Sequence, residues 1–346
     1  MISIAQLLRF AVDQGASDLH LSAGEAPMVR IHGDLQRVDV PVLTAEEAHR
    51  LIYDVLGDRQ RAQFQEQLEA DFAFQLDDEL RFRVNAFVHS RGEGAVFRTI
   101  PTKVPSMEQL GLPVALRRYC ALERGLVLVT GPTGSGKSTT LAAMIDHINE
   151  TRPAHILTIE DPVEFVHPGK RSLVNQREVG AETHSFSAAL RSALREDPDV
   201  ILVGEMRDLD TISLALTAAE TGHLVFGTLH TSSAVKTIDR IIDVFPSSQQ
   251  AQVRAMLSGS LQGVIAQRLL KRRNGGRVAA LEILQGTPAV RNLIRESKIH
   301  QLTSVMQVGG TQGMQTMEAA LASLVERGLV ETEEAKAHLP SSEVAA

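Results

Sequence analysis

The chain has few of the residues that crosslink small extracellular domains. It contains a single cysteine, Cys120, no tryptophan and only 4% aromatic residues. One cysteine cannot form an internal disulfide, and no Cys-x-x-Cys pair is present to hold zinc. The composition therefore argues against a disulfide scaffold and a cysteine zinc module, and it fits a reducing cytoplasm.

Long apolar runs are also missing. The longest, such as Leu126 to Val129 and Val200 to Val203, have the size of strands and lie far below the roughly 18 residues of a spanning helix. The first six residues do not combine a basic segment with an apolar stretch, so we expect no secretory signal. The net charge of -7, from 35 basic and 42 acidic residues, argues against a protein that coats nucleic acid.

The length and the hydrophobic fraction are those of a globular protein with more than one domain. A chain of 346 residues with 43% hydrophobic and 22% charged residues is long enough for about two ordinary domains. A stretch holding Pro101, Pro105, Gly111 and Pro113 interrupts any regular element. We therefore predict a first domain over 1–100, a linker over 101–113, a second domain over 114–340 and a disordered tail over 341–346.

The first hundred residues have the pattern of a small mixed α/β unit. Apolar residues at helical spacing predict a helix near 4–12, and a short strand follows at 17–21. A hairpin is expected around Gly33-Asp34, and Thr44 with Glu47 forms a capping box that opens another helix. Two more strands are predicted at 80–88 and 95–100.

Beyond the linker, strands and helices alternate, which predicts a mainly parallel sheet covered on both faces. The pattern predicts strands at 125–130, 155–159, 200–204 and 223–229, and helices at 138–149, 186–195 and 211–220. From Gln249 to Leu339 we expect chiefly helices. The basic cluster at 269–277 is interpreted as a solvated loop that ends a helix, with contact to an acidic partner or to lipid headgroups as the alternative.

The most specific motif is G-x-x-x-x-G-K-[ST], placed between an apolar strand and an amphipathic helix. The loop that satisfies it is Gly131-Pro132-Thr133-Gly134-Ser135-Gly136-Lys137-Ser138. Glycines let successive backbone N–H groups surround phosphate oxygens, Lys137 reaches the terminal phosphates, and Ser138 can hold magnesium. The motif predicts ATP and Mg²⁺ as the ligands.

Acidic residues follow two of the predicted strands. Glu160 follows the strand at 155–159, with Glu164 shortly after it, and Glu205 follows the strand at 200–204. In an open parallel sheet, ligands bind at the carboxyl ends of the strands. Because ATP cleavage needs carboxylates to hold magnesium and align a water, we predict that Glu205, also a metal ligand, and Glu160 share these roles. Which of the two is the base stays open, and helix capping is the alternative reading of a lone carboxylate.

Two histidines bracket the strand at 224–229. His230 could hydrogen-bond the γ-phosphate and report its loss, and we count His223 with the nucleotide-binding residues. The alternative for both is a histidine whose ring is satisfied by backbone groups at a strand end.

Four segments together resemble the secretion and pilus ATPases of the type II and type IV systems. The sequence GPTGSGKST, which ends at Thr139, is similar to the Walker A motif of that family, and ILTIEDPVEF at 156–165 to its Asp box. The sequence ALREDPDVILVGEMRD at 193–208 is similar to its Walker B motif, and AAETGHLVFGTLHT at 218–231 to its His box. The resemblance thus spans the whole ATPase core, Glu164 included.

Two features point to the pilus-retraction branch of the family. The segment 289–296, AVRNLIRE, is similar to the branch's AIRNLIRE signature, with Val290 in place of isoleucine. The longer N-terminal region and the tetracysteine zinc module of the assembly ATPases are both missing. Without the family, 289–296 is simply an amphipathic helix. With it, Arg291 and Arg295 are expected to be the exposed members that couple ATP turnover to retraction.

Two arginines of the first domain acquire a role from the same resemblance. Arg83 and Arg98 lie on the polar side of neighbouring predicted strands, where an arginine is usually only solvated. In the family, arginines of the matching segments RFRVNAF and AVFRTIP reach the nucleotide of an adjacent subunit. An arginine donated in this way stabilises transition-state charge and makes hydrolysis depend on the neighbour.

The resemblance implies a fold, an assembly and a function. It implies a PAS-like N-terminal domain, then a RecA-like P-loop ATPase domain with a helical C-terminal part. It also implies a homohexameric motor that hydrolyses ATP to retract type IV pili in twitching motility, at the cytoplasmic face of the bacterial inner membrane. The implied partner is an inner-membrane platform protein, with peripheral membrane contact only and with neither zinc nor nucleic acid. The alternatives are an assembly, secretion or DNA-transfer ATPase of the same superfamily, or a nucleotide-binding scaffold.

Overall fold

The computed structural model describes residues 2–31, 33–77, 80–100 and 103–339. By its internal contacts the chain divides into two compact units, Met1–Lys103 and Val104–Ala346. None of the helices in the described ranges has the length and apolarity needed to cross a membrane. The predicted tail at 341–346 lies outside the described residues.

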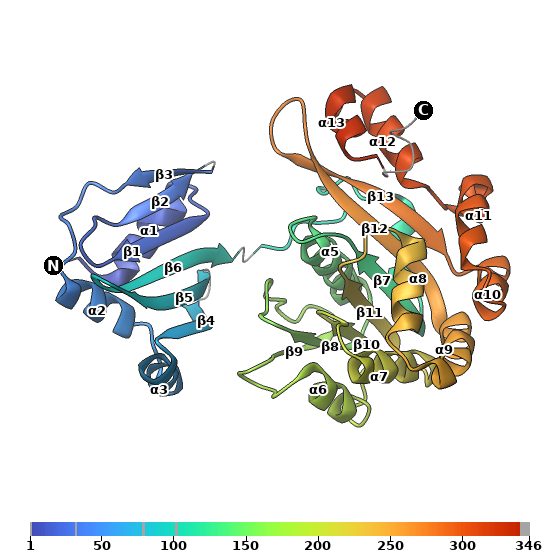
Figure 1. Ribbon diagram of the computed structural model, residues 1–346, viewed down its shortest axis with the longest axis horizontal. Helices are drawn as coiled ribbons and strands as arrows, with labels where there is room; N and C mark the ends of the chain where they lie inside the picture. Colours follow the sequence, from blue (N-terminus) through green and yellow to red (C-terminus); the bar gives the residue numbers. More distant parts are fainter. Residues whose placement is uncertain (1, 32, 78–79, 101–102, 340–346) are drawn as a thin grey trace. The chain divides into compact units, whose positions relative to one another are not determined.

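The first unit is a six-stranded sheet packed against helices (Figure 1). Its strand order is β3-β2-β1-β6-β5-β4, and every pair of neighbours is antiparallel. Its elements are α1 (Ile4–Asp13), β1 (Asp18–Ser22), β2 (Met28–Ile31), β3 (Asp34–Arg37), α2 (Ala45–Tyr53), α3 (Asp58–Gln67), β4 (Glu69–Gln75), β5 (Arg81–His89) and β6 (Gly92–Ile100).

Local sequence signals account for most of these elements. Both hydrogen bonds of the predicted capping box are present, because the Thr44 hydroxyl accepts from the Glu47 N–H and the Glu47 carboxylate accepts from the Thr44 N–H. Along β5, Phe82 and Val84 are buried against the helices while Arg83 is exposed, which is the alternation of a sheet with one covered face. Strand β4 was not predicted, and neither was helix α3. The pattern of α3 is hard to recognise because the helix is almost entirely polar and buries only Phe64.

The segment after the first unit is more ordered than a linker. Residues 101–102 lie outside the described part, but 104–113 belong to the second unit. Met107 and Leu112 are buried in its core. Within 104–113, Pro105, Gly111 and Pro113 therefore interrupt helices and strands without preventing this part of the segment from packing.

The second unit is built on a seven-stranded sheet with the order β13-β12-β7-β11-β10-β8-β9. All neighbours are parallel except the β12–β13 hairpin. Its strands are β7 (Gly125–Thr130), β8 (His155–Glu160), β9 (Leu173–Glu178), β10 (Val200–Val203), β11 (Leu224–Leu229), β12 (Leu261–Lys271) and β13 (Arg277–Gln285).

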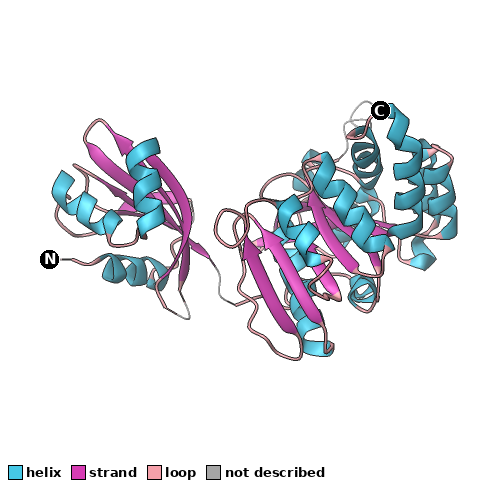
Figure 2. Cartoon of the chain, turned by 90° about the horizontal axis from the view of Figure 1, so that it is seen from below, coloured by secondary structure: helices cyan, strands magenta, loops and turns pink. Residues whose placement is uncertain are grey.

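Helices lie on both sides of this sheet (Figure 2). They are α4 (Arg117–Cys120), α5 (Lys137–Thr151), α6 (Phe186–Ala193), α7 (Leu209–Glu220), α8 (Ala234–Asp243), α9 (Ser247–Ser260), α10 (Pro288–Arg295), α11 (Leu302–Val308), α12 (Met317–Glu326) and α13 (Thr332–Ala337). Short 3₁₀ turns occur at Val114–Leu116, Ile299–Gln301 and Gly310–Gln312. The predicted fold class, a small mixed α/β unit followed by an α/β ATPase-type unit with C-terminal helices, is confirmed.

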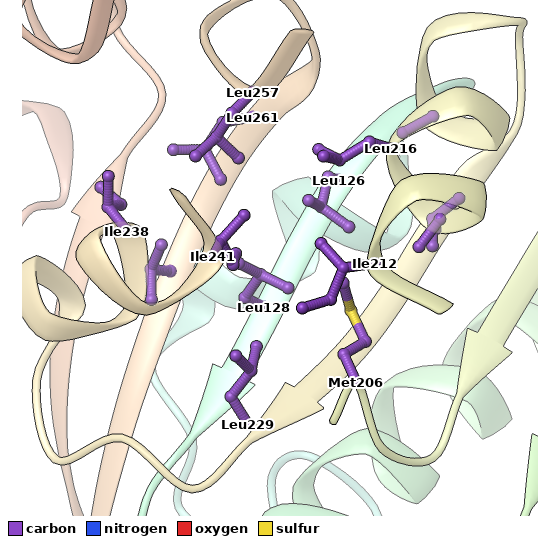
Figure 3. Packing of buried hydrophobic residues seen from close by; sticks show 14 of the residues in the cluster. Leu126, Leu128, Met206, Ile212, Leu216, Leu229, Ile238, Ile241, Leu257 and Leu261 are labelled. Carbon is purple, nitrogen blue, oxygen red and sulfur yellow. The ribbon is translucent and has the colours of Figure 1, made fainter. Parts of the chain in front are cut away.

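Strand β7 shows why the central strands are apolar throughout. Leu126 and Leu128 face one core, which is formed with α7, α8 and α9 (Figure 3). Val127 and Val129 face a second core on the opposite side, formed with α5. Because both faces are covered, every residue of β7 is buried, and the strand reads as a continuous apolar run.

One prediction for the C-terminal third is wrong. Residues 261–285, which we expected to be helical, form the long hairpin of β12 and β13. The basic cluster at 269–277 is the tip of that hairpin rather than the end of a helix. The apolar residues of β12 are buried on both sides of the strand, and such a short run does not distinguish a buried strand from a helix.

Candidate nucleotide-binding site

The phosphate loop joins the end of β7 to the start of α5. Gly131, Gly134 and Gly136 have φ angles of 147°, 78° and 84°, a region that glycine enters without strain. A Cβ atom at Gly131 would lie 2.3 Å from the Gln267 carbonyl oxygen. The loop therefore needs glycine for its conformation and for the close approach of β12, and it presents the N-terminus of α5 to a ligand.

Two polar groups of the loop are suited to a phosphate. The Lys137 ammonium donates to the carbonyl oxygens of Gly131 (2.8 Å) and Pro132 (3.2 Å), and burial lowers its pKa against the opposing effect of nearby carboxylates. The Ser135 hydroxyl is buried without a hydrogen-bond partner. A phosphate oxygen would give Lys137 and Ser135 a hydrogen-bond partner. Elsewhere in the loop, Pro132, Thr133 and Gly134 are exposed at the tip, and Ser138 and Thr139 are half-buried in the first turn of α5.

Gln267 on β12 supports the loop from behind, and the sequence analysis missed it. Its amide nitrogen donates to the Ser135 carbonyl (2.7 Å), and its amide oxygen accepts from the Thr140 hydroxyl (2.8 Å). Gln267 is buried. Only recognition of β12 as a strand neighbouring β7 could have revealed this contact.

Glu205 lies just beyond β10, where the sequence placed it, and it meets two cationic or polarisable side chains. Its Oε1 lies 2.8 Å from His230 Nε2, and it forms an ion pair with Arg207. Since β10 and β11 are parallel neighbours, their carboxyl ends bring Glu205 and His230 together. Burial lowers the pKa of the Lys137 ammonium, and the charge of Glu205 opposes that effect.

Glu160 and Glu164 occupy different environments. Glu160 accepts hydrogen bonds from the Thr158 hydroxyl (2.7 Å) and the Gln176 amide (3.3 Å), and desolvation raises the pKa of its carboxyl. Glu164 is exposed, and its charge acts on Lys137 together with that of Glu205. The pair of carboxylates that the electrostatics link to Lys137 is thus Glu205 with Glu164, whereas the sequence had paired Glu205 with Glu160.

His223 lies at the other end of the sheet from the phosphate loop. It directly precedes β11, and its carbonyl accepts from the N–H of Gly125 at the start of β7, whereas the loop follows the end of β7. Its ring Nδ1 is 3.0 Å from the Ala218 carbonyl. The structure of one chain does not bring His223 to the loop, because a strand places the residues before and after it at opposite edges of the sheet.

A cavity adjoins the phosphate loop within the second unit. Its volume is about 490 Å³, which is large enough for a nucleoside. Gly136, Thr139 and Thr140 form the side next to the loop, and Leu269 and Arg277 of the β12–β13 hairpin form part of another side. The hairpin that the sequence did not predict therefore supplies a wall of the cavity.

Arg83 and Arg98 are opposite each other on β5 and β6 of the first unit. Two like charges in direct opposition are unfavourable, and each arginine is paired with an aspartate. Arg83 contacts Asp71 at 2.6 Å, with both side chains almost half exposed, and Arg98 contacts the buried Asp18 at 2.9 Å. The arrangement gives the exposed face of this sheet a pair of arginines held side by side.

Comparisons with known proteins agree with this geometry. The family model for "Type II/IV secretion system protein" matches residues 1–337. The chain belongs to this family. It is 62% identical to the type IV pilus retraction ATPase PilT of Pseudomonas aeruginosa, over 99% of this chain and 100% of that protein.

Two further relatives of the secretion system family extend the comparison. The chain is 59% identical to a twitching motility protein of Neisseria gonorrhoeae, over 99% of this chain and 91% of that one. The crystal structure of the pilus retraction motor PilT with bound ADP is similar with a TM-score of 0.94 and 50% identity, covering 99% of both chains. The predicted family and its retraction branch are therefore confirmed.

Helix α10 carries the segment that resembles the signature of the retraction branch, and one expectation for it is wrong. Arg291 is not an exposed member, because its guanidinium donates to the carbonyl oxygens of Gly286 (2.9 Å), Leu261 (3.1 Å) and Gly259 (3.3 Å). It joins α10 to the ends of α9 and β13. Arg295 is exposed, as expected.

Proposed function

We propose that this protein is a motor subunit that binds Mg-ATP, hydrolyses it and uses the energy to retract type IV pili. The observation that carries the proposal is the phosphate loop at the same edge of the sheet as the segments that carry Glu205 and Glu164, in a chain 62% identical to the retraction ATPase of P. aeruginosa. A nucleotide-binding scaffold would need the loop but not the carboxylates.

The binding step follows from the loop. The N–H groups of 131–138 and the N-terminus of α5 surround the phosphates, while the adjoining cavity receives the nucleoside. Lys137 exchanges its two carbonyl contacts for phosphate oxygens, and the Ser135 hydroxyl gains the partner it lacks. Nucleotide binding thus satisfies groups that the free site leaves poorly satisfied.

The carboxylates divide the hydrolytic step between them. Ser138 and Glu205 offer the oxygen ligands that Mg²⁺ prefers, and the metal, when bound, neutralises charge on the β- and γ-phosphates. We assign the alignment of the attacking water to Glu164, which is exposed on the loop after β8. Glu160 is assigned to holding that loop through its hydrogen bonds, and His230 to orienting Glu205 and to sensing the γ-phosphate.

The assembly proposed is a homohexameric ring in which Arg83 and Arg98 complete the site of an adjacent subunit. Both arginines lie on an exposed sheet face and are held as a pair by Asp71 and Asp18. A guanidinium that arrives from a neighbour stabilises transition-state charge and links hydrolysis to subunit movement. We further propose that the ring works on the cytoplasmic face of the inner membrane against a platform protein.

A phosphate-release assay on the purified protein tests the enzymatic part. We expect Mg-dependent release that the change Lys137→Ala abolishes, and a wild-type protein that binds ATP without releasing phosphate would contradict the proposal. In the cell, deletion of the gene should produce surplus pili and no twitching. A deletion strain without pili would instead point to an assembly role, and one with normal pili and normal twitching would point to a secretion role.

Mixed rings test the arginines. Rings made only of Lys137→Ala or only of Arg98→Ala subunits contain no complete site, whereas a ring mixed in equal amounts has about one complete interface in four if Arg98 acts on a neighbour. Partial recovery of phosphate release on mixing supports action between subunits. Absence of recovery, with mixing verified by mass spectrometry, would contradict it.

A further inference from the structure

The segment 230–233 joins β11 to α8 and carries His230, the residue that contacts Glu205. Three contacts tie the segment down along its length. His230 meets Glu205 at its start (2.8 Å), the Thr231 hydroxyl lies 2.7 Å from the Thr237 hydroxyl, and the Ser233 carbonyl accepts from the same Thr237 hydroxyl at 2.7 Å. Two of the three depend on one side chain of α8.

Thr237 also reaches the phosphate loop. Its Oγ1 lies 3.4 Å from Oγ1 of Thr130, the last residue of β7, which directly precedes Gly131. Both threonines are completely buried. A hydroxyl can donate one hydrogen bond and accept two. Because the Ser233 carbonyl can only accept, the Thr237 hydroxyl donates to it and accepts a hydrogen bond from the Thr231 hydroxyl. One buried oxygen thus adjoins the start of the phosphate loop and the residue next to His230.

The helix that carries Thr237 is itself firmly placed. Ile238 and Ile241 belong to the hydrophobic core that also contains Leu128 of β7, and Ile241 lies next to Leu128 (Figure 3). At the first residue of the helix, the Ala234 N–H donates to the buried carboxylate of Glu282 on β13 at 2.6 Å. Because α8 is fixed at its N-terminus and along its apolar face, a contact made by Thr237 transfers that fixed position to the segment 230–233.

We propose that Thr237 is a positioning residue for ATP hydrolysis, which holds the His230–Glu205 pair in a fixed place relative to the phosphate loop. The inference rests on the function proposed above and adds a residue to it. The hydroxyl of Thr237 bonds Thr231, Ser233 and Thr130, and none of these is a glycine of the phosphate loop or a carboxylate. It acts through Thr231 and the backbone at Ser233, so its loss leaves the binding groups in place and loosens the group that orients Glu205.

The change Thr237→Val tests this directly, because valine fills the same space and removes only the hydroxyl. We expect kcat for phosphate release to fall about tenfold, since small misplacements of catalytic groups are costly, while the KM for ATP and the affinity for ADP change less than about threefold. The conservative variant Thr237→Ser, which keeps the hydroxyl, should restore most of kcat.

A matched control lies on α7. Thr217 makes the same type of bond inside a helix, from its hydroxyl to the Ser213 carbonyl four residues earlier at 2.9 Å, and none of its hydrogen bonds involves a residue assigned to the site. Thr217→Val, at a half-buried position, should remove this intrahelical bond and leave kcat unchanged. An equal loss of kcat in both variants would show that Thr237 acts only through overall stability, and it would overturn the inference.

A double variant tests the route through the histidine. In a His230→Ala background, Thr237→Val should lower kcat by less than about twofold, because the group that Thr237 positions is already gone. A full additional tenfold loss would overturn the inference. If Thr237→Val lowers the melting temperature by more than about 10 °C, the same measurements are made with Thr231→Val, whose position is only half-buried and which removes one of the two ties.

The outcomes separate this inference from the function on which it rests. A wild-type protein without ATPase activity contradicts the proposed function itself. An active wild-type protein with an equally active, folded Thr237→Val variant leaves that function standing and contradicts the role of Thr237 alone.

Discussion

Strands β8 and β10 end at the same edge of one sheet, and a glutamate follows or ends each of them. The two glutamates have different neighbours. At the end of β10, Glu205 faces cationic and polarisable groups, namely His230, Arg207 and the charge of Lys137. At the end of β8, Glu160 is surrounded by neutral donors, and its pKa is raised by desolvation. Position at a strand end therefore selects candidates, and the neighbouring side chains decide which candidate acts on the nucleotide.

We expect the largest loss of activity from a change at the end of β10. The change Glu205→Gln keeps the size of the side chain and removes the charge that faces Lys137. We expect kcat for phosphate release to fall about 100-fold or more, with ATP affinity almost unchanged, because the charge is needed in the transition state. Steady-state phosphate release measures turnover, and binding of a non-hydrolysable ATP analogue measures affinity. Undiminished turnover would remove Glu205 from the mechanism.

The neutral side chain of Gln267, which supports the phosphate loop, should affect kcat less than the charge of Glu205 does. The change Gln267→Leu removes the bonds to Ser135 and Thr140 without changing any charge. We expect the KM for ATP to rise about three- to tenfold and kcat to change little, since the loop loses rigidity but keeps its binding groups. Gln250→Leu on α9, which removes an amide hydrogen bond to the Phe245 carbonyl, is the control and should leave both constants unchanged. A larger fall in kcat than for Glu205→Gln would reverse the ranking.

The sequence predicted the parts of this site that depend on neighbouring residues in the chain. The phosphate loop, the strands before it and after it, and Glu205 were all placed where the structure has them, because glycine spacing and apolar runs are local signals. It did not predict Gln267, which requires knowing that β12 lies next to β7. It also placed His223 at the site, whereas within one chain His223 lies at the opposite edge of the sheet from the loop, because a pattern that brackets a strand does not say which end faces the ligand.

The environments of the two glutamates were likewise beyond the sequence. Glu160 and Glu205 each follow an apolar run, and each has one partner nearby in the chain, Thr158 and Arg207 respectively. The sequence does not show their tertiary neighbours, such as Gln176 and His230. Most elements of the first unit were predicted from capping and alternation. Helix α3 was not, because it has one buried apolar residue and so no periodicity to detect.

The raised pKa of Glu160 gives a smaller effect, on stability rather than on activity. A carboxyl whose pKa is higher in the folded than in the unfolded chain contributes stability below its unfolded pKa, and that contribution is lost as the pH rises through the folded pKa. At pH 8, which is above the unfolded pKa, the folded protein therefore bears the cost of desolvating this carboxyl, and Glu160→Gln removes that cost. We expect the variant to melt about 2 to 4 °C above the wild type at pH 8, and the difference to shrink at pH 4. A variant that is less stable than the wild type at pH 8 would contradict the assigned environment.

The central claim is that Glu205 and Glu164 act on the nucleotide while Glu160 supports the loop between them. Single-turnover phosphate release measured side by side for Glu164→Gln and Glu160→Gln, with ADP affinity as the control for an intact binding site, tests it most directly. The account predicts a fall of about 100-fold for Glu164→Gln and of less than about tenfold for Glu160→Gln, with similar ADP affinities. A Glu160→Gln variant as inactive as Glu205→Gln, beside an active Glu164→Gln variant, would contradict it.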